Sequence, residues 1–403
     1  MKQKRLKKII MMILIGATAL GILPGAVSAV HAEDPEAAMA AITKELRMAE
    51  GVTAPGAEFT FRFTSLSVDG ETATPENMPV ITDKSVVYSS ADTSTAVDGL
   101  VSVKKETGNI FAGVTFPHAG EYIYSVAEVA DTYSVADSET ISYSYAEYEM
   151  RVLVANLAGG GVYIKYVFVV PTVDAEGAPV AEGGKVDAAP SAPGGEGNGF
   201  KFVNTYTKRA GAVDPENPAD DEAALTINNE VVGSYGDTTK QFTFNIAFVN
   251  AATSNAASYT GKITRQDSSV EEQVFGSQGF GILSTGTEFT LAKGETLTFD
   301  DLPVGTKYTL SVAGAENYTT AVTVTENGVE AAHPGQKGQL LTLPEIKIGE
   351  NTNKLACVMT FDDGSIEETG ILMNNLPFFV LIAVVVAAFA GVAASKKLRR
   401  ELP

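Results

Sequence analysis

The chain has almost no cysteine, tryptophan or histidine. Its 403 residues include one Cys, no Trp and three His. Cys357 alone cannot form a disulfide within the chain, so an exported protein with this sequence must be made robust in another way. The histidines His31, His118 and His333 lie far apart without metal-ligand spacing. No Ser/His/Asp or Cys/His constellation is present either, so we expect no enzyme, no cofactor and no metal site.

Basic residues are also scarce. The sequence holds 29 Lys and Arg against 49 Asp and Glu, a formal net charge of −20. Such a surface repels nucleic acid and anionic lipid, which excludes both as partners of the folded part. Any contact with a membrane is therefore expected through a hydrophobic segment alone.

Both ends of the chain carry hydrophobic segments. A basic start, an apolar run and small residues up to Ala32 predict a signal peptide over residues 1–32, with an uncleaved anchor as the alternative. Near the other end, 376–394 is an apolar run of 19 residues. As a helix it would be about 28 Å long, which predicts a transmembrane helix. The basic tail 395–403 would stay in the cytoplasm and leave the bulk of the protein outside.

The remaining sequence is typical of an all-β protein. Segments such as EFTFRFTSL, GEYIYSVAE and KQFTFNIAF alternate apolar and polar residues, and Gly, Asn and Asp separate them. We predict two tandem immunoglobulin-like β-sandwich domains over 40–208 and 223–364, weakly similar to each other. A linker rich in Pro, Ala and acid joins them over 209–222. The Gly/Ala/Pro-rich stretch 171–198 is expected to form a long mobile loop in the first domain.

Three strands of the first domain place a polar residue in phase with apolar ones. Side chains alternate along a strand, so Lys44 in AITKEL faces the same way as the apolar residues two positions before and after it. Glu128 in EYIYSVAE and Asn204 in GFKFVNTY are in phase with Tyr and Phe residues. Because burying a lone charge is very unfavourable, we expect these three side chains to meet.

Such a group would permit covalent chemistry. Burial lowers the pKa of a lysine and raises that of a glutamate, so Lys44 can be a neutral nucleophile beside a neutral Glu128. Lys44 would attack the carboxamide of Asn204, while Glu128 polarises the carbonyl and carries protons as ammonia leaves. Two alternatives remain open from phase alone: a buried hydrogen-bonded triad without a bond, or surface residues whose phase differs from the assumed one.

The order of motifs in the first domain resembles a known family. The pattern TK…EFTFRF…GEYIYSVAE…YEMRVLV…GFKFVNTY is similar to the Gram-positive pilin isopeptide-linkage domain of streptococcal-type backbone pilins. In that family a Lys on the first strand bonds to an Asn on the last, assisted by a Glu on the tyrosine-rich strand. The resemblance implies that Lys44 and Asn204 form the cross-link and that Glu128 assists it.

The second domain resembles the companion pilin module but lacks its reactive residues. The segments LTINNEVVG, KQFTFNI and GTKYTLSVAG carry the likeness. Where the family has Lys, Glu and Asn, this sequence has Asn229, Val312 and Asp363. We therefore expect the same fold without the cross-link, with a plain hydrogen bond between Asn229 and Asp363.

The C-terminal segment resembles a sortase sorting signal of the pilin type. The motif IEETG over 366–370 precedes the hydrophobic span and the basic tail, although it lacks the usual proline. The resemblance implies cleavage between Thr369 and Gly370 and transfer of Thr369 to an amine. An ordinary single-pass anchor is the alternative.

These resemblances imply a structural function at the cell surface. The expected protein is a pilus shaft subunit or a wall-anchored pilin, with sortase, identical or related pilin subunits, peptidoglycan and host surface ligands as partners. The alternative is a wall-anchored adhesin stalk or minor pilin that does not polymerise. Polymerisation needs an accessible lysine, and the end of the first domain offers Lys185 and Lys201 as candidates.

Overall fold

The computed structural model describes residues 36–181, 183–192, 195–211, 223–282 and 285–362. Every regular element in these ranges is a β-strand, so the prediction of an all-β fold is confirmed. No helix among the described residues is long and apolar enough to cross a bilayer. The predicted signal peptide, the IEETG motif and the predicted transmembrane helix lie outside the described residues.

The first domain contains two sheets. The four-stranded sheet has the order β5-β1-β10-β7 and consists of β1 (Thr43–Ala49), β5 (Leu100–Glu106), β7 (Glu139–Ser142) and β10 (Lys201–Lys208). The six-stranded sheet has the order β3-β2-β6-β8-β9, with β4 paired to β2. Its strands are β2 (Glu58–Val68), β3 (Glu71–Thr72), β4 (Lys84–Val87), β6 (Gly120–Glu128), β8 (Glu147–Asn156) and β9 (Val162–Val173).

Aromatic side chains join the two sheets into a sandwich. Phe202 of β10 packs against Phe61 of β2 and Tyr148 of β8, with ring centroids 4.9 and 5.2 Å apart. The alternation that the sequence predicts is seen directly in β8 and β10, where every second side chain is buried. A large apolar core of Phe and Tyr rings therefore lies between the sheets.

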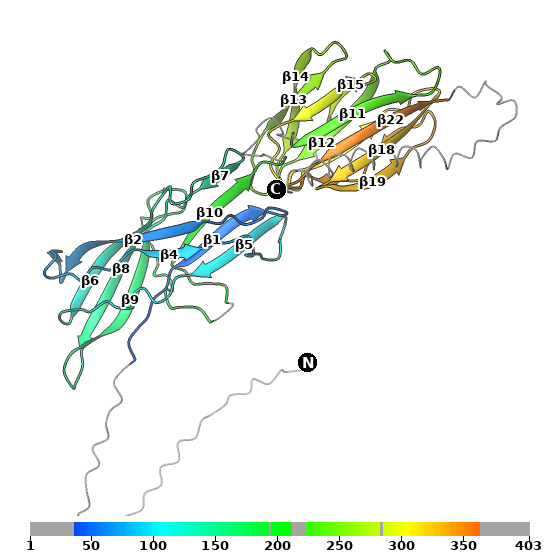
Figure 1. The fold of residues 1–403 in the computed structure, drawn as a ribbon. Helices are drawn as coiled ribbons and strands as arrows, with labels where there is room; N and C mark the ends of the chain where they lie inside the picture. The colour runs from blue at the N-terminus through cyan, green and yellow to red at the C-terminus, as the bar shows by residue number, and fades with distance from the viewer. Residues whose placement is uncertain (1–35, 182, 193–194, 212–222, 283–284, 363–403) are drawn as a thin grey trace, which may run out of the picture. The chain divides into compact units, whose positions relative to one another are not determined.

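The first and last strands of this domain lie side by side, as Figure 1 shows for β1 in blue and β10 in green. They pair in parallel from Thr43 opposite Lys201 to Met48 opposite Tyr206. A parallel pair cannot be closed by a short turn, and here the connection is the rest of the domain.

The second domain repeats this arrangement of first and last strands. Its strands run in the order β19-β18-β22-β11-β16-β13-β14-β12-β17-β20, with β15 beside β12 and β21 beside β17. The first strand, β11, pairs in parallel with the last, β22. The bounds are β11 (Leu225–Val232), β12 (Phe242–Val249), β13 (Ser258–Thr264), β14 (Val270–Gln278), β15 (Thr287–Leu291), β16 (Thr296–Phe299), β17 (Lys307–Val312), β18 (Tyr318–Glu326), β19 (Val329–Pro334), β20 (Leu341–Thr342), β21 (Ile346–Lys347) and β22 (Lys354–Phe361).

The stretch expected to be a mobile loop is attached to the first domain. Part of it is strand, since β9 extends to Val173. Val186 N–H donates to the carbonyl of Val169, and Ala188 is buried. Asn198 donates from its carboxamide to the carbonyl of Ala41, next to β1. Hydrogen bonds therefore connect the described part of this stretch to β9 and to Ala41, next to β1, while its expected mobility stays a prediction.

Candidate functional site

The pairing of β1 with β10 fixes Lys44 and Asn204 on one face of the same sheet. Lys44 is opposite Phe202, and Leu46 is opposite Asn204, so the two polar residues are offset by two positions along neighbouring strands. Since an offset of two preserves the side-chain direction, both point into the sandwich. Both residues are completely buried.

Glu128 approaches from the facing sheet. It is the last residue of β6 and lies opposite Phe61 of β2. Its side chain has no exposed area, and neither has that of Lys44. The three residues that share an apolar phase in the sequence thus come from three strands of two sheets.

The three side chains are in direct contact. Lys44 Nζ lies 2.7 Å from both carboxylate oxygens of Glu128. Asn204 Nδ2 donates to Glu128 Oε1 at 2.8 Å. Glu128 therefore bridges the amine and the amide nitrogen, which are the groups between which a proton must move if the amine displaces that nitrogen.

Burial shifts the pKa values of Lys44 and Glu128 in the directions that favour their uncharged forms. Desolvation lowers the pKa of Lys44 to about 8, although the nearby Glu128 charge opposes the shift. Desolvation also raises the pKa of Glu128 above its ordinary value, against the opposing effects of Lys44, Asn204 and the main-chain N–H of Ser144. Phe59 adds to the apolar surroundings, with its ring centroid 4.7 Å from Lys44 Nζ. Both shifts favour the neutral amine that nucleophilic attack requires.

One contact of the site involves a residue that sequence analysis did not single out. Asn204 Oδ1 accepts a hydrogen bond of 2.8 Å from the main-chain N–H of Ser144. Glu128 was expected to polarise this carbonyl, but its carboxylate contacts the amide nitrogen instead. A main-chain donor leaves no side-chain signal in the sequence, so phase and motif could not reveal it.

The two domains match two different protein-family models. The family model of the Spy0128-like isopeptide containing domain matches residues 40–207. These residues match the family that their motifs resemble. Residues 223–339 match a domain of unknown function (DUF7601).

Solved structures of pilus proteins are also similar to the chain. The major pilin from Streptococcus pyogenes has 20% identity and a TM-score of 0.32, covering 81% of this chain and 98% of that chain. The major pilin protein T3.2 from Streptococcus pyogenes has 20% identity, the same coverage and a TM-score of 0.33. A pilus-presented adhesin has 17% identity and a TM-score of 0.23, covering 49% of this chain and 36% of its own. No curated protein matches the chain.

The equivalent position in the second domain holds no reactive group. Val312 ends β17 opposite Phe244 of β12, just as Glu128 ends β6 opposite Phe61. Asn229 is buried and donates to the carbonyls of Leu291 and Ala292. The Asp363 to which a hydrogen bond was expected lies outside the described residues.

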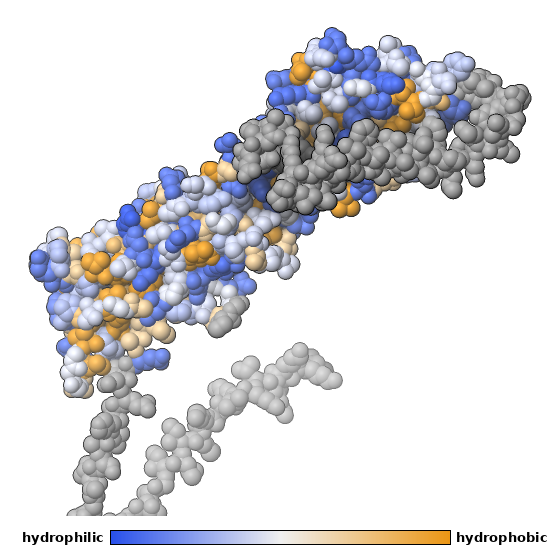
Figure 2. All heavy atoms as spheres, in the orientation of Figure 1, coloured by the Kyte–Doolittle hydropathy of each residue, from blue (hydrophilic) through white to orange (hydrophobic). Residues whose placement is uncertain are grey.

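The two candidate linking lysines differ in their surroundings. Lys185 is exposed, and its Nζ lies 3.8 Å from the ring centroid of Phe168. Figure 2 shows apolar residues gathered over the part of the surface that carries β8 and β9. Lys201 Nζ instead lies 3.0 Å from Glu45 Oε2. Burial favours the neutral form of the Glu45 carboxyl, yet hydrogen bonds from Arg47 and Ser102 and the ion pair with Lys201 lower its pKa to about 2, so Lys201 is paired with a permanent anion.

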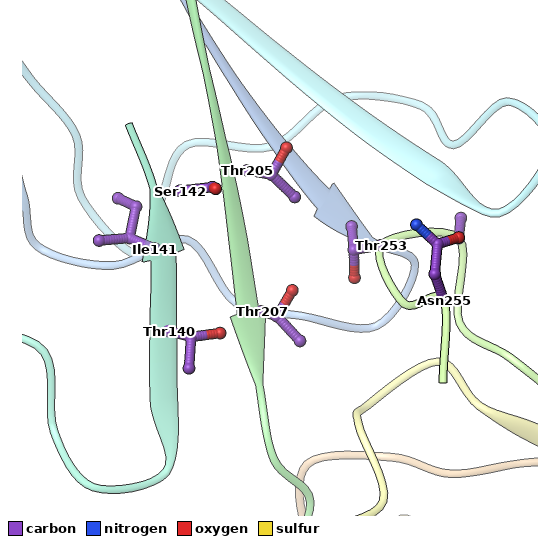
Figure 3. Close-up of a pocket in the computed structure, with 8 residues that line it drawn as sticks. Thr140, Ile141, Ser142, Thr205, Thr207, Thr253 and Asn255 are labelled. Carbon is purple, nitrogen blue, oxygen red and sulfur yellow. The ribbon is translucent and has the colours of Figure 1, made fainter. Parts of the chain in front are cut away.

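The described residues contain no group of three or more His, Cys, Asp or Glu side chains that could hold a metal ion. The hollow in Figure 3 is lined by uncharged side chains, among them Thr140, Ser142, Thr205 and Thr207. Thr205 and Thr207 alternate with the buried Asn204 and Tyr206 along β10, so the hollow is on the other face of this strand from the triad.

The pKa of Glu128 can be tested in a variant without its cation. Lys44→Met replaces the lysine by an uncharged side chain of similar length and leaves the Glu128 carboxyl buried. Because the folded pKa then exceeds the ordinary value of 4.5, the folded chain holds a proton that the unfolded chain releases. The free energy of unfolding should be greatest below pH 4.5, the ordinary pKa. It should fall by up to about 1.4 kcal/mol per pH unit as the pH rises, until the pKa of Glu128 in the folded protein is passed.

Urea unfolding of Lys44→Met between about pH 4 and 8 measures this dependence. The control is the double variant Lys44→Met/Glu128→Gln, which lacks the titrating group. Identical pH profiles for the two variants would contradict a raised pKa at Glu128.

Proposed function

We propose that this protein is a pilus shaft subunit whose first domain is cross-linked by an isopeptide bond between Lys44 and Asn204. The observation that carries the proposal is the buried contact of Lys44, Glu128 and Asn204 within the residues that match the isopeptide family. The family match supports a pilus subunit, and the cross-link and polymerisation are the finer parts of the proposal. The protein acts as a structural component, since bond formation occurs once per chain.

The contacts support a specific course for bond formation. Neutral Lys44 Nζ attacks Cγ of Asn204 and forms the new C–N bond. The bond from Cγ to Nδ2 then breaks, and Glu128 transfers a proton from the attacking nitrogen to the departing one. The products are a secondary amide and ammonia.

The cross-link would stabilise the domain through the unfolded state. It would close a loop of about 160 residues between the first and last strands. By the chain-entropy relation used for disulfides, this amounts to about 5 kcal/mol. It would supply the covalent reinforcement that a chain with one cysteine cannot obtain otherwise.

Subunits would be joined by sortase through the IEETG sequence. We propose that the Thr369–Gly370 bond is cut and that Thr369 is transferred to a lysine of the next subunit or to peptidoglycan. Lys185 is the stronger candidate because it is an exposed residue, whereas Lys201 is paired with Glu45. The protein would then be extracellular, first exported by its signal peptide and held briefly by its C-terminal helix.

A second candidate function is a wall-anchored adhesin stalk or minor pilin. The same cross-linked domain would serve there as a rigid spacer, and polymerisation would be absent. Host surface ligands would be partners in this case.

Intact-protein mass spectrometry of a recombinant fragment covering residues 33–369 tests the cross-link. We expect a mass below the sequence value by one ammonia, about 17 Da, because the amide bond forms with loss of one NH3. Glu128→Ala should restore the full mass. A full mass in the unaltered protein would exclude the cross-link, and a loss of two ammonias would show that the second domain is also linked.

Limited proteolysis tests the difference between the domains. If only the first is cross-linked, the second should be cleaved first and should melt at the lower temperature. Glu128→Ala should reduce the difference, since it removes a stabilisation of about 5 kcal/mol from the first domain alone. Earlier cleavage of the first domain in the unaltered protein would contradict this assignment.

Polymerisation with the cognate sortase tests the linking lysine. Lys185→Ala should abolish the ladder of high-mass species on a denaturing gel, while Lys201→Ala should retain it. Lys165→Ala is a matched control, because Lys165 is also exposed and lies 5.4 Å from the ring centroid of Tyr166.

A ladder from the Lys185→Ala/Lys201→Ala double variant would place the linking lysine elsewhere. If the unaltered protein forms no ladder but is recovered attached to wall fragments, the adhesin or minor pilin function is correct.

A further inference from the structure

The carbonyl oxygen of Asn204 is held by the main chain of a neighbouring segment. Ser144 is buried, and its N–H donates to Asn204 Oδ1 at 2.8 Å. When an amine adds to Cγ, the π electrons of the carbonyl move onto Oδ1, so this oxygen becomes negative. A donor already in place, within a site shielded from water, stabilises such charge without reorganisation.

The end of the β7 ladder explains why this N–H is available. β7 pairs with β10 up to Ser142 opposite Thr205, and the chain then leaves the sheet. Two residues after Ser142, the N–H of Ser144 again points toward β10. It donates to the side chain of Asn204 in place of a main-chain carbonyl of β10.

The neighbouring residues hold this N–H in position. Tyr145 N–H donates to the carbonyl of Ala175 at 3.1 Å. Ala146 N–H donates to Ser144 Oγ at 3.3 Å. The ring of Tyr143 packs against Phe59, with centroids 6.0 Å apart. The segment 143–146 is therefore fastened on both sides of the donor.

The hydrogen bonds also determine the orientation of the Asn204 carboxamide. Only its oxygen can accept from the Ser144 N–H, and only its nitrogen can donate to Glu128. The leaving nitrogen thus faces the proton carrier, and the oxygen faces the main-chain donor. Turning the amide over would break both hydrogen bonds.

We propose that the main-chain N–H of Ser144 is the oxyanion donor for amide exchange at Asn204. This inference rests on the proposed Lys44–Asn204 bond and adds a catalytic group to it. Lys44 Nζ forms a bond to Cγ, and the carbonyl electron pair becomes the lone pair on Oδ1 facing Ser144. The pair then returns, the bond to Nδ2 breaks, and ammonia leaves with the proton delivered by Glu128. Loss of one such donor slows related reactions by about 10²- to 10³-fold.

An amide-to-ester replacement tests the donor with little change of shape. Lactic acid incorporated at position 144 replaces the N–H by an oxygen and gives the side chain of alanine. The matched control is Ser144→Ala, which keeps the N–H and lacks only the hydroxyl. Cell-free synthesis of the full chain, sampled over time by intact-mass measurement, follows the loss of ammonia in both.

The ester protein should lose ammonia at least about 100-fold more slowly than Ser144→Ala. Equal rates within about threefold would overturn the role of Ser144 and leave the cross-link intact. Absence of any mass loss in the unaltered protein, followed in the same way, would instead overturn the cross-link itself. Melting both forms in a Glu128→Ala background, where no bond forms, should show equal stability within a few degrees, so that slow reaction is not caused by misfolding.

A second measurement does not depend on the ester protein folding. In Lys44→Ala, which cannot react, the Ser144 amide should be protected from hydrogen exchange by Asn204. Adding Asn204→Ala should increase exchange at Ser144 by at least about tenfold relative to the Tyr145 amide, whose acceptor is unchanged. Unchanged protection of Ser144 would show that Asn204 is not the acceptor that protects this amide and would overturn the inference.

Discussion

The parallel pairing of β1 with β10 is the contact on which the site depends. It joins the two ends of the domain, so a bond between these strands encloses nearly the whole chain of the domain. It also sets the offset of two residues that aims Lys44 and Asn204 to the same side. Glu128 has to reach them from the opposite sheet, and the packing of Phe61 on Phe202 sets the distance between the sheets. A shift of one residue in this register would turn Lys44 or Asn204 toward the outside.

The proposed reaction also affects the free-energy cost of burying the charges of Lys44 and Glu128. A Lys–Glu ion pair without solvent exposure is weak evidence for stability, because desolvation opposes the attraction between the charges. The proposed reaction would remove both charges. Of the three protons on a charged lysine amine, one would remain on the new amide, one would leave with ammonia and one would pass to Glu128. A buried ion pair would thus become a neutral amide beside a neutral acid, in a core where burial already raises the pKa of Glu128.

Much of this arrangement could be predicted from sequence, because side-chain period and strand order are visible in it. AITKEL, EYIYSVAE and GFKFVNTY each show a polar residue in an apolar phase, and the structure brings all three together. The contact of Ser144 could not be predicted, because every residue except proline carries a main-chain N–H and the sequence does not mark which one will be used. The hydrogen bonds that connect the 171–198 stretch to the rest of the domain could not be predicted either. Its Gly, Ala and Pro content is typical of loops, whereas the hydrogen bonds of Asn198 with Ala41 depend on the tertiary fold.

The second domain shows that the framework can exist without the reactive residues. β11 and β22 are parallel like β1 and β10, and Asn229 is opposite Cys357. The residue two positions further along β22 is the buried Met359, whereas the Asp363 that the motifs align with Asn204 lies outside the described residues. With Asn229 in the place of the lysine and Val312 in the place of Glu128, the second domain has neither the amine nor the proton carrier at the positions where the first domain has them. The parallel pairing of first and last strands is therefore a property of the fold in both domains, and the capacity for a cross-link is added to it by three side chains in the first.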